Sequence, residues 1–259
     1  MADQTLLDLY QNTSKHSNYQ VLATRVQLLL PQETVSVTSR WERERLDYLC
    51  ARLDVAGMRL ADIGGNTGFF SFELLDRGAA SVDYYEGNPE HCSFVTHAAH
   101  QLGLADRLHA HHGYLDFERP ALPVYDAVCL LNVLHHIGDD YGDKATRADQ
   151  VQATIVNALK AMAHHARHLI FQVGFNWQGD PKRPIFGNGT KAEVIELVNS
   201  VAGDYKTLAV GIAARNDNGA IAYRDLDAIN VHRDDTLGEF LNRPLFILRS
   251  RHFPAERAR

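Results

Sequence analysis

Three glycines and two acidic residues are spaced so that they could hold a small polar ligand. The segment RLADIGGNTGFFS covers residues 59–71, and its glycines are Gly64, Gly65 and Gly68. Glycine has no Cβ, so the backbone can turn tightly there and approach a ligand closely. Asp62 precedes the turn and could accept a hydrogen bond from a cationic amino group, directly or through water. Glu86 closes the next apolar run, where its carboxylate could accept both hydroxyls of a ribose. These residues predict a site for an adenosine-containing cofactor.

The spacing of the glycines narrows the kind of nucleotide. A dinucleotide-binding turn reads G-x-G-x-x-G, and its middle glycine lets the pyrophosphate approach. Here the residues read GGNTG, with Asn66 at the middle position, and no G-K-[ST] follows as in a P-loop. The pattern D-x-G-x-x-x-G therefore favours a nucleoside without a pyrophosphate, and it disfavours a nicotinamide-dependent dehydrogenase.

The elements around this turn alternate between strands and helices. We expect strands at 58–63, 81–86, 108–112, 125–131 and 168–174, with helices at 68–77, 89–102 and 144–165. Strands that alternate with helices in this way imply βαβ units, a parallel sheet and ligand binding beyond the carboxyl ends of the strands. Two late strands, at 207–214 and 244–251, lack a convincing crossover helix and predict an antiparallel pair at the sheet edge.

The chain is expected to have two parts. Residues 1–57 read mostly as helices and predict an N-terminal cap or lid, with amphipathic runs at 6–10, 21–30 and 41–53. Residues 58–259 would form the catalytic domain, with a partly ordered insertion at about 215–243 that lies over the active-site face.

Charge and hydropathy limit the partners that the chain could bind. The net charge is -6 and the pI is about 6.1, which argues against nucleic acid and anionic membranes as partners. The first thirty residues have no signal-peptide core, and no apolar run is long enough to span a bilayer. We therefore expect a cytoplasmic protein, and these features leave open whether it forms a homo-oligomer.

Four segments in order resemble the motifs of the class I S-adenosylmethionine-dependent methyltransferases. They are ADIGGNTGF (61–69), VDYYEGNP (82–89), RLHAHHGYLDF (107–117) and YDAVCLLNVLHHI (125–137). The resemblance implies a Rossmann-like α/β fold with a mostly parallel seven-stranded sheet and an antiparallel last strand. It also implies S-adenosylmethionine as the cofactor and methyl transfer as the reaction.

The resemblance assigns expected roles to residues of these motifs. Asp62, the three glycines of the turn and Asn66 would surround the methionine and ribose parts, together with Phe69, while Asn132 would face the methionine part. Glu86 would bind the ribose diol; Gly87, Asn88, Tyr114 and Leu115 would lie near the adenine. An acid usually follows the glycine of the third motif, but Tyr114 stands there, so Asp116 or a backbone carbonyl could recognise the adenine amino group.

Two histidines follow the fourth strand, beside the expected methyl donor. His135 or His136 could remove a proton from an attacking hydroxyl, because the pKa of an imidazole suits neutral pH. The alternative is a structural histidine that orders the loop. His109 and His111 share one face of a strand, but no Cys or Glu is spaced to complete a zinc site, so no metal is expected.

The segments expected to form the acceptor site lie outside the motifs. His16, Tyr19 and Gln20 could close over the cofactor as a lid. Arg40 and Trp41 could anchor its carboxylate, which the guanidinium of the arginine would bind with two donors. The loops at 138–150 and 175–190 are polar and aromatic, which suits a hydroxylated acceptor such as a sugar or glycan.

A narrower resemblance concerns the substrate. WERERLDYL (41–49) followed by DIGGNTGFFSFE (62–73) is similar to methyltransferase domains that cap bacterial surface polysaccharides. The other substrates considered are a tRNA wobble uridine and a small molecule or quinone. A protein that binds S-adenosylmethionine without catalysis also fits the motifs.

Overall fold

Short apolar runs in the first half of the chain form parallel strands, as their alternation with helices predicts. The structure is a computed structural model, and it describes residues 4–11, 20–35, 38–117, 121–139, 141–142 and 146–254. The chain divides into two compact units, residues 1–114 and 115–259. The boundary expected at 57/58 stays a prediction.

The first unit holds three parallel strands in the order β3-β2-β1. These are β1 (Arg59–Ile63), β2 (Ser81–Glu86) and β3 (Leu108–His112). Asp62 is in register with Tyr84, and Glu86 with His112, so the carboxyl ends of the three strands lie at one edge. Helix α4 (Phe69–Asp76) connects β1 to β2, and α5 (Pro89–Gln101) connects β2 to β3.

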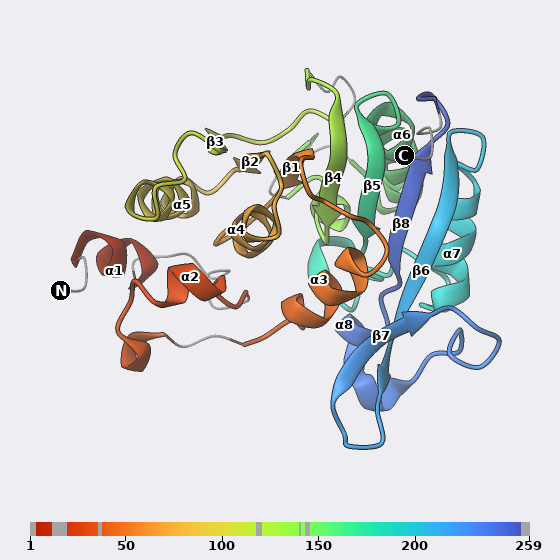
Figure 1. Cartoon of the computed structure of the whole chain (residues 1–259). Helices are drawn as coiled ribbons and strands as arrows, with labels where there is room; N and C mark the ends of the chain where they lie inside the picture. Colours follow the sequence, from red (N-terminus) through yellow and green to blue (C-terminus); the bar gives the residue numbers. More distant parts are fainter. Residues whose placement is uncertain are drawn as a thin grey trace. The chain divides into compact units, whose positions relative to one another are not determined.

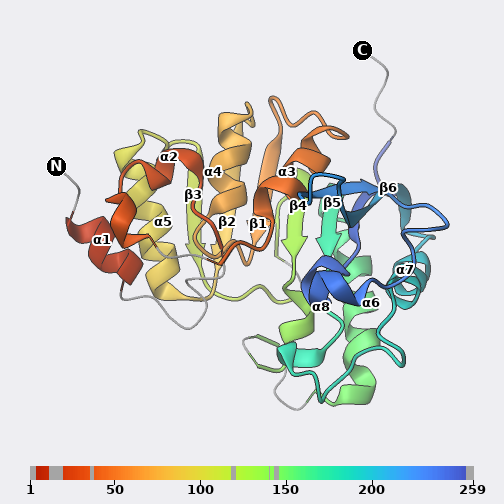
Figure 2. The ribbon, with the colours of Figure 1, turned by 90° about the horizontal axis from the view of Figure 1, so that it is seen from below.

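The N-terminal part of this unit is helical, but its helices are short. They are α1 (Gln4–Gln11), α2 (Thr24–Gln27), the single 3-10 turn η2 (Gln32–Thr34) and α3 (Glu42–Cys50). Helix α1 packs beside α5, as Figures 1 and 2 both show. Helix α2 is shorter than the run expected at 21–30, because i to i+3 bonds tighten the chain ahead of Pro31.

The second unit holds five strands in the order β4-β5-β8-β6-β7. They are β4 (Tyr125–Leu131), β5 (Ala166–Gln172), β6 (Tyr205–Arg215), β7 (Ile221–Asp225) and β8 (Leu245–Ser250). β4 and β5 are parallel, whereas β8 lies antiparallel between β5 and β6. The antiparallel pairing expected for the two late strands is confirmed. The edge strand is β7, which the sequence did not predict.

The helices of this unit are α6 (Val151–Met162), α7 (Lys191–Asn199) and the short α8 (Gly238–Leu241). Figures 1 and 2 show α6 and α7 side by side. The 3-10 turns are η3 (Leu134–His136), η4 (Ala148–Gln150), η5 (Trp177–Gly179) and η6 (Asp235–Leu237). The helix expected at 144–165 is shorter, with η4 leading into α6. Among the described residues, no helix is long and apolar enough to cross a membrane.

Candidate functional site

The glycine turn in the first unit lies between β1 and α4. Gly64, Asn66 and Gly68 have positive φ angles of 68°, 53° and 80°, a conformation that glycine adopts readily and asparagine tolerates. The backbone N–H groups of Gly64 and Gly65 both donate to the carbonyl of Tyr85. A Cβ on Gly65 would stand 2.5 Å from the Tyr84 ring and 2.9 Å from Asp62 Oδ2. The turn therefore requires glycine at position 65, and it lies against the end of β2.

Glu86 connects the turn to the residues that follow β2. The backbone N–H of Asn66 donates to Glu86 Oε2 at 2.9 Å, and that of Asn88 donates to Oε1 at 2.9 Å. These two bonds fix the plane of the carboxylate. A carboxylate has about four acceptor sites, so each oxygen can accept more than one hydrogen bond. A carboxylate oriented in this way suits the hydroxyl groups of a ribose.

Asp62 is a buried carboxyl group beside the turn, with 3% of its surface exposed. Its Oδ2 accepts a hydrogen bond from the Ser71 hydroxyl at 2.8 Å. Burial raises the pKa of Asp62 from 3.8 to about 6, although the hydrogen bonds from Ser71 oppose that rise. A cation placed at this carboxyl would favour its charged form. Asp62 therefore fits the ammonium group of an amino acid moiety.

Two tyrosines lie near the end of β2. Tyr84 is fully buried, and its hydroxyl donates to the carbonyl of Asn66. Tyr114 is 59% exposed, and its ring covers Gly87 so closely that a Cβ there would overlap it. The absence of a Cβ at Gly87 therefore leaves room for the ring of Tyr114, a residue that we expected near the adenine. The Asn88 side chain accepts from the N–H groups of Glu90 and His91 and so caps α5.

The N-terminal segment contacts the turn through Gln20. Its Oε1 accepts from the Thr67 hydroxyl at 2.9 Å and from the Phe69 N–H at 3.2 Å. Phe69 itself is fully buried. Arg40 is half-buried, and its backbone N–H donates to Glu42 Oε2. Tyr19 and His16, the other residues of the expected lid, lie outside the described residues.

In the second unit, Asn132 follows β4 in a left-handed conformation with a φ of 61°. Its Nδ2 donates to Gln172 Oε1 at 2.9 Å, and its Oδ1 accepts from Arg243 Nη1 at 2.8 Å. Both ends of the Asn132 amide are therefore bonded to protein groups. Leu115, the other residue of this unit that was expected to bind the cofactor, is half-buried.

The two candidate catalytic histidines differ in their surroundings. His135 is buried, and its Nδ1 accepts from the Gly174 N–H at 3.2 Å, which places the ring proton on Nε2. Burial holds the pKa of His135 well below 6.5, with smaller contributions from Arg243 and His136. His136 is half-buried, and the centroids of the two rings are 4.3 Å apart. His135 thus has a partner that orders the loop, whereas His136 is the more accessible imidazole.

Aromatic side chains connect the loops after β4 and β5. Trp177 is buried, and its Nε1 donates to the carbonyl of Ile137 at 2.6 Å. The guanidinium of Arg183 stacks 3.6 Å from the centre of the Trp177 ring. Tyr141 donates its hydroxyl to the carbonyl of Val133. The sequence predicted that both loops matter for the acceptor but did not predict these contacts.

Other histidines gather around Asp83 and on α5. His109 Nδ1 lies 2.9 Å and His111 Nε2 lies 3.6 Å from Asp83 Oδ1. Within the described ranges, no group of three or more His, Cys, Asp or Glu side chains could hold a metal ion.

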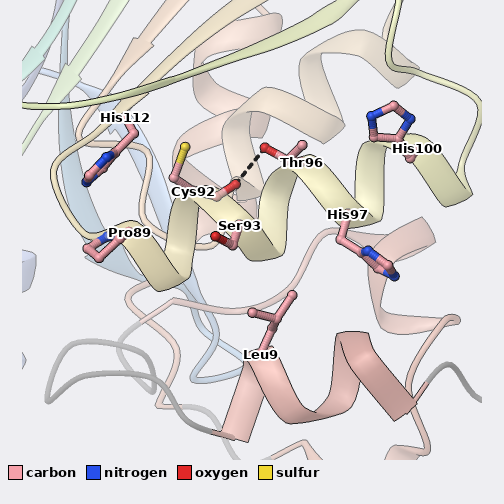
Figure 3. A pocket seen from close by; sticks show the side chains of 8 residues that line it. All are labelled: Leu9, Pro89, Cys92, Ser93, Thr96, His97, His100 and His112. Carbon is pink, nitrogen blue, oxygen red and sulfur yellow. Dashed lines mark hydrogen bonds between the residues drawn. The ribbon is translucent and has the colours of Figure 1, made fainter.

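A pocket is lined by residues of α1, α5 and the end of β3 (Figure 3). Its volume is about 390 Å³. Its lining residues are Leu9, Pro89, Cys92, Ser93, Thr96, His97, His100 and His112. None of the expected site residues lines this pocket.

Comparisons with known proteins concern the fold. No family model and no curated protein matches the sequence. Two structures of WbdD match 94% of this chain, one of them a complex with the kinase inhibitor LY294002. They have TM-scores of 0.61 and 0.58 and identities of 17% and 18%. The chain spans 47% and 46% of the two WbdD chains, about half their length.

Two further structures match with lower TM-scores. One is PH1948 from Pyrococcus horikoshii, provisionally described as an RNA methyltransferase, with a TM-score of 0.47 and 12% identity over 80% of this chain and 81% of that one. The other is the mitomycin 7-O-methyltransferase MmcR, with a TM-score of 0.47 and 16% identity over 80% of this chain and 53% of that one. The chain therefore shares its α/β fold with about half of the WbdD chain.

Proposed function

We propose that this protein is an S-adenosylmethionine-dependent methyltransferase that methylates an oxygen of a hydroxylated acceptor. The observation that carries the proposal is the geometry of Glu86. Its carboxylate is fixed at the end of β2 by the N–H groups of Asn66 and Asn88, directly beside the glycine turn. This position suits a ribose diol, and the turn has no glycine where a pyrophosphate would need one.

The residues of the first unit would each hold a different part of the cofactor. Glu86 would accept hydrogen bonds from the ribose hydroxyls, and the buried carboxyl of Asp62 would accept a hydrogen bond from the ammonium group. The half-exposed ring of Tyr114 would cover the adenine, and Arg40 could bind the carboxylate. When bound, S-adenosylmethionine supplies a methyl group on a positively charged sulfur.

The second unit would bind and deprotonate the acceptor. His136 is the residue that we assign as the base, because it is half-buried where His135 is buried, and it ends the 3-10 turn η3 that follows β4. It would hold the proton that the acceptor hydroxyl loses. His135 would order the loop, since its Nδ1 is bonded to the Gly174 N–H. Most of the rate enhancement would come from positioning the reactants.

A sugar or glycan is the acceptor class that we favour. The loops after β4 and β5 carry Trp177, Arg183 and Tyr141. Trp177 is hydrogen-bonded to the carbonyl of Ile137 and stacked against Arg183, and Tyr141 is hydrogen-bonded to the carbonyl of Val133. Aromatic and polar side chains together suit a ring that has both apolar faces and hydroxyl groups. The similarity of residues 41–49 and 62–73 to polysaccharide-capping methyltransferase domains supports the same class.

The acceptor and the chemistry can be tested in one assay. The wild-type protein would be incubated with methyl-labelled S-adenosylmethionine and one of three acceptor sets: methyl glycosides with short oligosaccharides, bulk tRNA, and a catechol with a short-chain quinol. We expect label in the carbohydrate set together with S-adenosylhomocysteine. Label only in tRNA or in the phenols would replace the glycan assignment. Tight cofactor binding without transfer to any set would favour a non-catalytic binding protein.

A further inference from the structure

Arg243 is a buried cation that precedes β8, more than a hundred residues after the loop that carries the histidines. Its side chain is 11% exposed. Nη2 donates to Glu239 Oε2 at 2.6 Å, and Nε donates to Glu239 Oε1 at 3.2 Å. Nη1 donates to Asn132 Oδ1 at 2.8 Å. The guanidinium therefore binds a carboxylate with two donors and an amide with a third, which holds its plane in one orientation.

The same residues close a ring of hydrogen bonds. The Asn132 amide donates to Gln172 Oε1 at 2.9 Å, and the Gln172 amide donates to the carbonyl of Arg243 at 2.9 Å. Asn132 follows β4 and Gln172 ends β5, so the ring joins the carboxyl ends of these two parallel strands. Arg243, Asn132 and Gln172 are each hydrogen-bonded to the next, so the ring is a continuous polar network.

The network extends to the loop after β5. Glu239 Oε1 also accepts from the Phe175 N–H at 3.2 Å. A Cβ on Gly174 would stand 2.9 Å from His135 Nε2 and 3.1 Å from the Cζ of Arg243. Arg243 and His135 therefore pack against the same glycine, whose N–H donates to His135.

We propose that Arg243 is a positioning residue for methyl transfer, which fixes the start of the loop that carries His136 and holds His135 in one tautomer. This inference rests on the proposed function. Arg243 acts through Asn132 at the start of the loop and through Gly174 beside His135. The segment between β7 and β8 thereby contributes to the acceptor part of the site.

A purely structural salt bridge is the competing explanation. In that case the loss of Arg243 would lower the stability of the protein, and the folded fraction would retain the wild-type rate. A positioning role instead changes the rate in the folded protein, because a small displacement of a catalytic group lowers turnover by about 100-fold.

The kinetic test compares four variants of the full chain. R243M removes all three donors, R243K keeps the charge without the fork, and E239Q leaves Arg243 in place with a weaker partner. R251M is the control, because Arg251 follows β8 and its Nε donates two hydrogen bonds, to the carbonyls of Ala202 and Tyr205. We expect kcat to fall about 100-fold in R243M and less in R243K and E239Q, with cofactor affinity within twofold of the wild type. R251M should retain the wild-type kcat.

A second readout does not depend on turnover. In ¹⁵N-histidine-labelled protein, the long-range ¹H–¹⁵N spectrum reports which ring nitrogen of His135 carries the proton. The wild type should show a neutral ring protonated at Nε2, and R243M should show an altered or averaged pattern. If R243M does not fold, the His135 spectra of R243K and E239Q provide this readout.

The two readouts separate the inference from the proposed function. Wild-type kcat together with an unchanged His135 spectrum in the folded Arg243 variants would overturn the inference and leave the proposed function standing. If the wild type binds S-adenosylmethionine but transfers no methyl group, the proposed catalysis fails. The His135 spectrum then decides by itself whether Arg243 controls the loop.

Discussion

The backbone N–H of Asn66 donates to the carboxylate of Glu86 at 2.9 Å, so the turn after β1 and the last residue of β2 form one unit. The Asn88 N–H holds the other carboxylate oxygen at the same distance. Because these bonds exist within the protein alone, Glu86 is oriented before any ligand binds. Such preorganisation reduces the entropy that binding loses. Glu86 is therefore both a structural residue and a candidate cofactor-binding residue.

We expect D62N to stabilise the ligand-free protein above pH 6. Burial raises the pKa of Asp62 from 3.8 to about 6, so the folded state binds more protons than the unfolded state between these pH values. Stability therefore falls as pH rises through that window, by about 3 kcal/mol at 1.36 kcal/mol per pH unit. Urea denaturation at pH 4.5 and 7.5 measures the part of this loss that falls between these two pH values, about 2 kcal/mol. D106N, at an exposed aspartate, is the control and should keep the pH dependence of the wild type. If the stability of D62N depends on pH as that of the wild type does, the pKa of Asp62 is not raised by burial.

Cofactor binding should release protons near pH 6. A bound ammonium group favours the charged form of Asp62, so the pKa of this carboxyl should fall from its value of about 6 when the ligand binds. Calorimetric titrations with S-adenosylmethionine at pH 6, in two buffers of different ionisation enthalpy, give the number of protons released. Wild-type protein should release a fraction of one proton that D62N does not release. Equal release by both proteins would exclude Asp62 as the partner of the ammonium group.

G65A should destabilise the glycine turn. The added Cβ would overlap the Tyr84 ring at 2.5 Å and approach Asp62 Oδ2 at 2.9 Å, and both groups are buried. Overpacking of this kind costs about 1–3 kcal/mol. Thermal unfolding measures the loss, and G203A is the control because a Cβ there meets nothing within 4 Å. A melting temperature for G65A equal to that of G203A would show that the turn is more open than the structure has it.

H136Q and H135Q should separate catalysis from loop order. H136Q should lower kcat by about 100-fold or more and leave cofactor affinity unchanged, because a general base contributes about 10²–10⁴-fold. H135Q should lower the free energy of unfolding, because the bond between Nδ1 and the Gly174 N–H is altered in a buried site. Initial rates and urea denaturation on both variants test this assignment. If H136Q turns over at the wild-type rate, His136 is not the base.

The local sequence predicted the parts of the fold that depend on short-range patterns. Apolar runs and glycines placed β1, β2, β3 and β4 within a residue or two, and the acids at positions 62 and 86 stand at the strand ends as expected. The helix α7 was not predicted, although Thr190 and Glu193 form a capping box that is a recognisable start signal.

Contacts between distant parts of the chain could not be predicted in the same way. Gln20 reaches Thr67 across 47 residues, and Arg243 reaches Asn132 across 111 residues. No periodicity encodes such pairs, since they follow from how the strands are ordered in the sheet. An arginine before the last strand and a glutamine at the end of an apolar strand were the available signals. Each indicates a polar partner without identifying it.

The most direct test is the affinity of S-adenosylmethionine for E86A. The loss of a charged acceptor of the ribose hydroxyls should weaken binding by about 1–3 kcal/mol, about 5- to 150-fold in Kd. Isothermal titration calorimetry measures this affinity, circular dichroism confirms that the variant is folded, and E90Q, at an exposed glutamate two residues after Asn88, is the control. We expect E90Q to bind as the wild type does and E86A to bind more weakly. Equal affinities for folded E86A and wild type, or no binding by the wild type, would contradict the assignment of this turn as the cofactor site.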